Sequence, residues 1–385
     1  MKIGLLNFYF ANNYGATLQC YALYSTLKKC GHEVEIIDYR PKEILNAYHM
    51  KLNIFKDKVQ ELKGEKFSVT YIIKLLHRIL QYYFWYIANW KLVIKMKKFD
   101  DFIDKNLPDV SARYNSYEEI ISNPPKCDCY IAGSDQIWNM DNTGGKLDKT
   151  FFLKFGKKNV TRVVYGASCG KEDLLEEDVN CIINYCENID AVSVREQSLM
   201  SQLYKNKTNL SLSKVCDPVF LIDKEEWDKV KIFKGKEDEY ILLYLLDKNK
   251  YLQDIINEIK IAYPHYKIYD ISYKKNNING IDKWKQSCGP DCFLSYISNA
   301  KMIITDSFHG TAFSVIYHKV FVSLIRRDTG IRITDLLVNI KLANQIYDPK
   351  RNIKNYSESI DFSYAEKYIK KEKEKSLTFL YNSIR

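Results

Sequence analysis

The feature of this sequence that most constrains the fold is a strand–turn–helix pattern between Lys301 and Tyr317, KMIITDSFHGTAFSVIY. Met302 to Thr305 are apolar or β-branched without interruption, which predicts a short buried strand. A polar turn follows, and the apolar residues from Ala312 to Tyr317 have the spacing of a buried helix. A strand that passes through a tight turn into a helix is typical of α/β folds, in which the strands form a parallel sheet.

The turn of this pattern carries side chains that suit ligand binding. In open α/β sheets such a turn lies at the carboxyl edge of the strands, where ligands bind. His309 can give or take a proton near neutral pH, Ser307 comes two residues before it, and Gly310 lets the backbone come close to a ligand. The unpaired N–H groups at the start of the helix also favour an anion. A packed histidine at a helix cap would explain His309 as well, but its position at this edge favours a function.

Strands and helices alternate on both sides of a charged segment, residues 223–238. Residues 1–222 predict an N-terminal α/β domain, which opens with a strand, a loop, a helix and a second strand. Residues 239–345 predict a C-terminal α/β domain, and residues 346–385 predict a tail whose lysine-rich helix packs back on the first domain. A length of 385 residues suits two domains. The predicted fold class is therefore α/β, with two Rossmann-like domains facing each other across a cleft.

The alternation is interrupted at residues 41–106, where no convincing strand occurs. Tyr71 to Trp90 is apolar and aromatic, and three basic side chains interrupt it. The uncharged remainder, Ile79 to Trp90, is too short to span a bilayer. We interpret this region as a helical insertion in the first domain. Two interpretations of its aromatic face stay open: it packs on the first domain, or it touches a membrane, because aromatic residues beside lysines suit a bilayer interface.

The charge balance and the cysteines limit the partners and the compartment. Lys and Arg number 58 and Asp and Glu 48, a net charge of +10, which favours anionic partners such as phosphorylated substrates or a membrane surface. Because much of the excess is lysine in predicted helices, where it forms solvated faces, we expect no nucleic-acid partner. The ten cysteines are scattered without a Cys-x-x-Cys pair, and the first ten residues predict a strand rather than a signal peptide. We therefore expect a cytoplasmic protein, either free or peripheral at the inner face of the cell membrane.

Facing domains would bring several strand ends together in the cleft. The candidates from the first domain are Asn13, Gly15, Ser134, Asp135 and Arg195, and those from the second are Ser307, His309, Gly310 and Arg332. Arginines at strand ends suit bidentate binding of a carboxylate or a phosphate, and an opposing histidine suits proton transfer. The sequence contains no P-loop, no Gly-x-Ser-x-Gly and no metal-ligand spacing, and its first loop has one glycine where a dinucleotide fingerprint has three. We therefore expect Arg195 and His309 to carry the chemistry, without a metal.

Seven motifs together resemble the polysaccharide pyruvyl transferase family. They are spread from the N-terminus to about residue 340, and they leave out the insertion and the tail. The motifs are NNYGATLQCYAL (Asn12 to Leu23), HEVEIIDYRP (His32 to Pro41), IAGSDQIWN (Ile131 to Asn139), RVVYGAS (Arg162 to Ser168), SVRE (Ser193 to Glu196), CDPVFL (Cys216 to Leu221) and TDSFHGTAFS (Thr305 to Ser314).

The resemblance implies a fold similar to the two-domain B-type glycosyltransferase (GT-B) architecture. It also implies transfer of a pyruvyl group from phosphoenolpyruvate to two hydroxyls of a sugar, which forms a pyruvate ketal on a surface polysaccharide or its precursor. The acceptor would be a saccharide, including lipid-linked and nucleotide-linked forms. Phosphoenolpyruvate is the donor substrate, so no cofactor is expected. Related enzymes bind it with an arginine of the first domain and an Arg-x-His pattern of the second; Arg195 matches the former and His309 matches the histidine.

The chain departs from that pattern at one position. Ser307 stands where the second arginine of the family is found, as in the branch whose motif reads Ser-Phe-His-Gly, and Arg332 or Arg326 could supply the lost cation. Two other functions stay open. One is a GT-B glycosyltransferase that uses a nucleotide sugar, whose diphosphate would lie near His309. The other is a non-catalytic component of polysaccharide assembly that binds a sugar or a lipid carrier.

Overall fold

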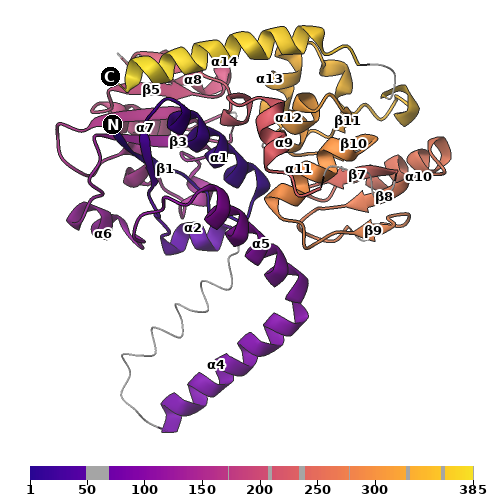
Figure 1. Ribbon diagram of the computed structural model, residues 1–385, viewed down its shortest axis with the longest axis horizontal. Helices are drawn as coiled ribbons and strands as arrows, with labels where there is room; N and C mark the ends of the chain where they lie inside the picture. Colours follow the sequence, from indigo (N-terminus) through magenta and orange to yellow (C-terminus); the bar gives the residue numbers. More distant parts are fainter. Residues whose placement is uncertain are drawn as a thin grey trace.

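The computed structural model describes residues 1–48, 69–171, 173–206, 210–233, 239–276, 278–326, 330–356 and 360–384. The described strands form two sheets, and the pairings within each sheet are parallel (Figure 1). The predicted α/β fold class with two Rossmann-like domains is therefore confirmed. The apolar runs form the strands because both faces of each sheet are covered, which favours continuous rather than alternating hydrophobic sequence.

The first sheet has the strand order β2-β1-β3-β4-β5-β6. Its strands are β1 (Lys2–Leu6), β2 (Glu33–Ile36), β3 (Cys129–Asp135), β4 (Thr161–Ala167), β5 (Ala191–Val194) and β6 (Leu212–Lys214). The helices in this half are α1 (Tyr14–Lys29), α2 (Lys42–Ala47), α4 (Val69–Ala88), α5 (Trp90–Asn106), α6 (Tyr117–Ser122), α7 (Glu176–Cys186), α8 (Gln197–Lys205) and α9 (Lys224–Lys229). Short 3₁₀ turns are η2 (Met140–Asn142), η3 (Lys149–Phe152) and η4 (Pro218–Phe220).

The second sheet has the order β11-β10-β7-β8-β9. Its strands are β7 (Tyr240–Tyr244), β8 (Lys267–Asp270), β9 (Lys283–Trp284), β10 (Met302–Thr305) and β11 (Val320–Ser323). The remaining helices are α10 (Leu252–Ala262), α11 (Pro290–Asn299), α12 (Phe308–Ile316), α13 (Ile331–Asn339) and α14 (Ser363–Ser383), with 3₁₀ turns η5 (Ala343–Gln345) and η6 (Ile353–Tyr356). β10 is the strand that the opening motif predicts.

Helix α1 joins the two halves. Tyr14 in its first turn stacks on Phe293 of α11, with ring centroids 4.4 Å apart, and on Phe99 of α5, with centroids 5.3 Å apart. The Tyr14 hydroxyl also donates a hydrogen bond of 2.8 Å to the Cys288 carbonyl. A buried aromatic cluster with a satisfied hydroxyl contributes both apolar area and directional contacts. The N-terminus of α1 is therefore held between the sheets, where the site lies.

The C-terminal helix α14 runs along one side of both halves (Figure 1). Near its start Ala365 packs into the core around the second sheet, and near its end Leu380 packs into the core of the first. Between them, the Cys216 N–H donates a hydrogen bond of 2.9 Å to the Ser376 hydroxyl. The charged segment 223–238, of which residues 234–238 lie outside the described ranges, remains our proposed boundary between the domains.

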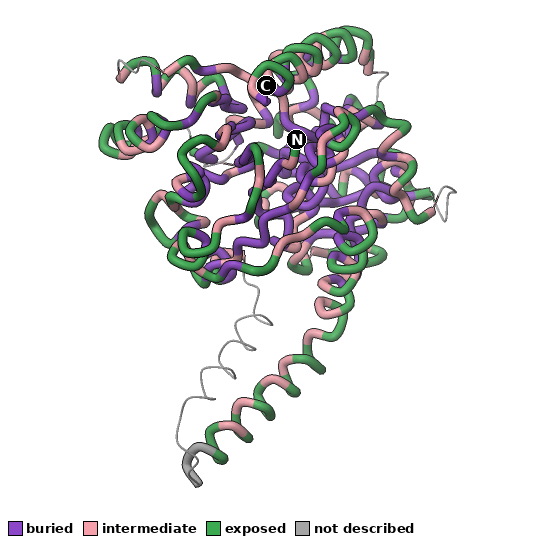
Figure 2. Tube along the Cα trace, turned by 60° about the vertical axis from the view of Figure 1, so that its left-hand side comes forward, coloured by how far each residue is buried: buried purple, intermediate pink, exposed green. Residues whose placement is uncertain are grey.

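The predicted insertion contributes α2, α4 and α5, while residues 49–68 lie outside the described part of the chain. Helix α5 ends against the body, where Phe99 and Phe102 are buried, and α4 projects away from it (Figures 1 and 2). None of the helices in the described ranges is long and apolar enough to cross a membrane.

Candidate active site

Arg195 lies between β5 and α8, at the carboxyl edge of the first sheet. Its backbone N–H donates a hydrogen bond of 3.2 Å to the Ala167 carbonyl, which fixes the chain as it leaves the strand. The guanidinium is buried, and its Nε lies 3.1 Å from Glu196 Oε1 while its Nη1 pairs with Asp217 Oδ2. Burial alone would lower the pKa of Arg195, but the neighbouring carboxylates outweigh it and raise that pKa. Arg195 is therefore a fixed cation.

Asp217 connects Arg195 of the first half to His309 of the second. Its side chain is 0% exposed, and its Oδ2 is 3.5 Å from His309 Nε2 and in direct contact with Arg195. The other oxygen, Oδ1, accepts a hydrogen bond of 3.1 Å from the Val219 N–H. Burial would raise the pKa of this carboxyl, but the charges of His309 and Arg195 hold it well below its usual range. Asp217 is therefore an anion that holds two candidate catalytic groups together.

His309 lies in the first turn of α12, which begins at Phe308, four residues before the predicted apolar run. The helix begins early because the Ser307 hydroxyl accepts a hydrogen bond of 3.4 Å from the Gly310 N–H and caps it. The His309 ring packs directly on Gly15 of α1: a Cβ at Gly15 would lie 2.0 Å from His309 Nδ1. The helix starts of α1 and α12 thus meet at the imidazole. This contact leaves Nε2 as the nitrogen that faces the carboxylates.

Asp135 places a second arginine beside the first. It ends β3 with φ at 70°, a conformation that non-glycine residues rarely adopt and that often marks functional positions. Its Oδ1 lies 3.6 Å from Arg195 Nη2 and 3.7 Å from Arg332 Nη1. The Phe308 ring lies under both guanidiniums, with its centroid 5.1 Å from Arg195 Cζ and 5.7 Å from Arg332 Cζ. Burial and the charge of Arg195 lower the pKa of Arg332.

Three buried nitrogen atoms of this cluster have no hydrogen-bond partner within the described part of the chain. They are Arg195 Nη2, Arg332 Nε and His309 Nε2. Leaving a buried polar group unpaired costs about 1–3 kcal/mol, more if it is charged, so such groups are rare and usually have a function. Three unpaired donors in one place, against one unpaired acceptor, Glu196 Oε2, suit an oxygen-rich anion, which accepts hydrogen bonds without offering any.

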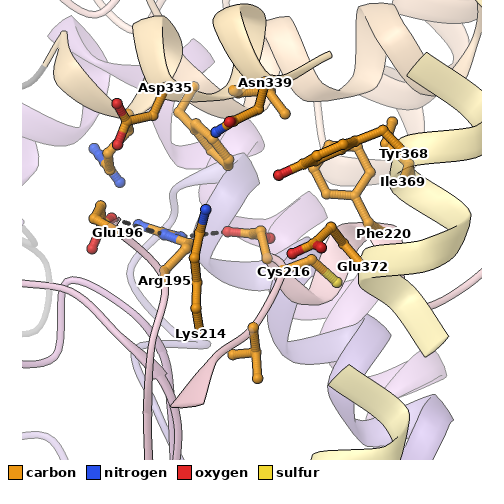
Figure 3. Close-up of a pocket in the computed structure, with 15 residues that line it drawn as sticks. Arg195, Glu196, Lys214, Cys216, Phe220, Asp335, Asn339, Tyr368, Ile369 and Glu372 are labelled. Atoms are coloured by element: carbon orange, nitrogen blue, oxygen red, sulfur yellow. Dashed lines mark hydrogen bonds and ion pairs between the residues drawn. The ribbon is translucent and has the colours of Figure 1, made fainter. Parts of the chain in front are cut away.

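A cavity opens beside the cluster, between the ends of β5 and β6 on one side and α13 and α14 on the other (Figure 3). Its volume is about 80 Å³. Both arginines and Phe308 line it, and Lys214, Tyr368 and Glu372 face into it. The cavity therefore offers a small ligand access to the guanidiniums.

The other predicted site residues have packing or capping contacts. Asn13 caps α1, where its side chain accepts hydrogen bonds from the N–H groups of the second and third helix residues, at 2.9 and 3.3 Å. Ser134 is fully buried and donates a hydrogen bond of 2.9 Å to the Gly166 carbonyl. A Cβ at Gly310 would lie 2.3 Å from Thr305 Oγ1, so this glycine serves the packing of α12 on β10. These contacts position the cluster rather than face the cavity.

Of the two arginines that could replace the one missing at Ser307, the structure places Arg332 in the cluster. Arg326 pairs instead with Asp247. Its neighbour Arg327 lies outside the described residues. The position of Arg332 could not be found from the motif, because it lies more than twenty residues further along, in α13.

Sequence reasoning missed Asp217, Glu196 and Phe308. A signal for the two acids was present, since each lies in a motif shared with the family, SVRE or CDPVFL, directly after a strand or a polar turn. A buried acid needs a cationic partner, and for Glu196 the sequence offers one in the preceding residue, Arg195. No group of three or more His, Cys, Asp or Glu side chains in the described ranges is arranged to hold a metal ion.

The solved structures to which this chain is similar include an epimerase and a heptosyltransferase. A UDP-GlcNAc 2-epimerase of Neisseria meningitidis, bound to UDP-GlcNAc, is 12% identical, with 99% of this chain and 100% of that chain covered and a TM-score of 0.46. A heptosyltransferase of E. coli with ADP is 8% identical, with 97% and 100% covered and a TM-score of 0.39. Likenesses this weak carry no argument about function.

A search of the curated proteins found no match. The family model described as polysaccharide pyruvyl transferase matches residues 13–328, which is more than half of the chain. The match spans the α1 start, Arg195, Asp217 and His309. The chain therefore belongs to the polysaccharide pyruvyl transferase family.

Proposed function

We propose that this protein transfers a pyruvyl group from phosphoenolpyruvate to two hydroxyls of a sugar in a surface polysaccharide or its precursor. The product is a pyruvate ketal and the by-product is phosphate. The donor is a substrate, so the proposal needs no resident cofactor. The observation that carries the proposal is a set of three buried nitrogens that have no hydrogen-bond partner among the described residues, Arg195 Nη2, Arg332 Nε and His309 Nε2. Their side chains share the carboxylates of Asp135 and Asp217.

The two guanidiniums suit the donor because phosphoenolpyruvate carries a carboxylate and a phosphate on the same carbon atom. Arginine binds both groups in a bidentate manner, and a buried guanidinium is not lost to deprotonation. Asp135 Oδ1 lies 3.6 Å from Arg195 Nη2 and 3.7 Å from Arg332 Nη1, and both distances are too long for a hydrogen bond. Donor oxygens would supply hydrogen bonds to Arg195 Nη2 and Arg332 Nε, which have none within the described residues.

His309 suits the proton transfers. Its Nε2 would give a proton to the vinyl carbon of the donor, which becomes a methyl group and leaves an oxocarbenium-like centre at the next carbon. The first sugar hydroxyl adds to that centre and returns a proton to Nε2. The carbon–oxygen bond to phosphate then breaks, the second hydroxyl adds, and its proton leaves with the phosphate. Such proton transfer typically contributes about 10²–10⁴ in rate.

The small cavity beside the cluster suits this donor. A volume of about 80 Å³ suits a ligand with few heavy atoms, whereas a nucleotide sugar needs a longer site. A diphosphate can be bound by the backbone N–H groups at a helix N-terminus alone, so it does not require two arginines beside a histidine.

The test is to titrate the purified protein with phosphoenolpyruvate and with UDP-sugars in a calorimeter, and to assay phosphate and nucleotide release with saccharide acceptors. We expect phosphoenolpyruvate to bind and to release phosphate. Arg332→Gln should weaken that binding by roughly tenfold or more, since a charged hydrogen bond is worth about 1.5–3 kcal/mol.

Arg326→Gln is the matched control, because Arg326 pairs with Asp247 outside the cluster, and it should bind the donor as the unmodified protein does. Nucleotide release without phosphate release would indicate a glycosyltransferase. A protein that binds saccharide but releases neither product would indicate a non-catalytic binding component. Either result would refute the proposed transfer.

A further inference from the structure

Helix α4 presents an apolar stripe that the rest of the described chain leaves uncovered. Ile73, Leu76, Leu80, Tyr83, Phe84 and Ile87, hereafter the α4 stripe, recur every three or four residues and are all exposed, Phe84 by 68%. This spacing places them on one face of the helix. Figure 2 shows that α4 stands clear of the body, and none of its described side chains is buried. Exposed apolar patches of this extent mark interaction surfaces.

The charge around the stripe has one sign. From Val69 to Phe99 the sequence contains six Lys or Arg residues and no Asp or Glu. The +10 charge of the chain has the same sign, so it adds to the attraction for an anionic surface. Because a second copy of the chain would bring this same cationic segment against itself, like-charge repulsion opposes pairing through the stripe.

The aromatic residues indicate the depth of contact. Tyr82 to Tyr86 reads YYFWY, and Trp90 follows at the start of α5 with 53% exposed. Trp and Tyr are enriched where hydrocarbon meets lipid headgroups, because their rings are apolar and their N–H or O–H groups are polar. An amphipathic helix with such a face and basic flanks lies in the plane of the bilayer surface.

At its C-terminal end α4 continues into α5, which is anchored to the body. Helix α5 connects it to the body, where Phe99 stacks on Tyr14 and Phe102 is buried. The Ser287 hydroxyl of the second half donates a hydrogen bond of 3.0 Å to the Lys91 carbonyl in the first turn of α5. A surface presented on a braced helix can meet a flat membrane without reorganising the body.

We propose that the α4 stripe docks on the surface of an anionic phospholipid membrane and holds the protein there peripherally. This goes beyond the proposed transfer reaction and does not depend on it. The stripe supplies the apolar contact, and the basic residues from Val69 to Phe99, apart from the buried Lys95, supply the attraction to anionic headgroups. The contact is interfacial, in keeping with the absence of a membrane-spanning helix from the described ranges.

The test is co-sedimentation of the full-length protein with vesicles of phosphatidylcholine alone, and with vesicles of phosphatidylcholine and phosphatidylglycerol in equal parts. We expect about tenfold or tighter binding to the mixed vesicles, falling as the NaCl concentration is raised to about 0.5 M. The double variant Leu80→Glu/Phe84→Glu should lose about tenfold or more, because it removes two apolar contacts and adds two like charges to the lipid. Both side chains are exposed, so the fold should be retained, and thermal unfolding checks this.

Ile261→Glu is the matched control. Ile261 is an 83% exposed apolar residue on α10, far from α4 in Figure 1, and its substitution should leave vesicle binding unchanged. Equal sedimentation with both kinds of vesicle would overturn the proposal, and so would a double variant that binds as the unmodified protein does. If the protein does not bind vesicles but forms a dimer, and the double variant abolishes that dimer, then the stripe binds a second copy of the chain instead.

Discussion

The contact between Gly15 and His309 makes a sharp prediction. In Gly15→Ala the new Cβ would meet the imidazole at 2.0 Å, whereas ordinary contact begins at 3.4 Å, so the ring must move by about 1.4 Å. The ring is buried and its Nε2 lies 3.5 Å from Asp217, so the movement would displace it from the cluster. A displacement of 1 Å at a catalytic group can lower the rate by about 10²-fold, which is the loss we expect in phosphate release.

The free energy of unfolding of Gly15→Ala distinguishes the steric overlap with His309 from the change in helix propensity. Gly15 lies inside α1, where alanine is favoured over glycine by about 1 kcal/mol. Overpacking costs about 1–3 kcal/mol, so after the gain in helix propensity Gly15→Ala should be destabilising by up to about 2 kcal/mol in the unmodified protein. In a His309→Ala background the overlap disappears, and the same change should become stabilising by up to about 1 kcal/mol.

Urea unfolding of the two single variants, the double variant and the unmodified protein measures this reversal of sign as a double-mutant cycle. Catalysis is assayed on the same samples. If Gly15→Ala destabilises equally in both backgrounds, or retains full activity, then the start of α1 does not hold His309 and the assignment of Gly15 is wrong.

Three further predictions concern two buried charges and the cap of α12. Asp217→Asn should destabilise by about 3–5 kcal/mol, because it removes the carboxylate that pairs with both the buried Arg195 and His309. Since the pKa of Asp217 is depressed, its contribution is fully present above the usual value of 3.8 and is lost as pH falls below it, so urea unfolding from about pH 3 to about pH 7 should show a constant difference between the two proteins that narrows only below about pH 4. Lys95→Met should stabilise the protein at neutral pH by about 1 kcal/mol. Burial lowers the pKa of Lys95 to about 8, so below that pH the charged side chain destabilises the fold. The lost contact with the Tyr14 ring, whose centroid lies 4.4 Å from Lys95 Nζ, offsets part of the gain. The gain should vanish as pH rises toward 10.5, and a gain that stays constant with pH would contradict the account. Ser307→Arg should lower stability by about 1 kcal/mol or more in thermal unfolding, because it removes the cap of α12 at a buried position, and unchanged stability would mean that the cap is dispensable.

Local sequence determines the strand–turn–helix elements of this fold well. The run from Met302 to Thr305 forms β10 as predicted, because an unbroken apolar and β-branched stretch followed by a polar turn strongly favours a buried strand. The strands β6 and β9 were not predicted, since they have three and two residues and carry lysines, so they have no hydrophobic signal of their own. They form strands because their backbones pair with the neighbouring strands β5 and β8.

The candidate site was predictable only in part. Arg195 and His309 could be found because each lies directly after a predicted strand, in a motif that resembles a family. Their partner Asp217 was missed, because the pairing of a carboxylate with two groups from different domains depends on how those domains pack. Arg332 was one of two open candidates, and only the packing of α13 against β3 residues distinguishes it from Arg326.

The measurement that tests the central claim most directly is phosphate release from phosphoenolpyruvate in the presence of a panel of saccharide acceptors, including lipid-linked ones. The unmodified protein should release phosphate, and His309→Ala should lower the rate by about 10²–10⁴-fold while keeping its thermal unfolding transition. A His309→Ala protein that releases phosphate at the full rate with a competent acceptor would contradict the account, and His309 would then be a packed side chain at the start of α12.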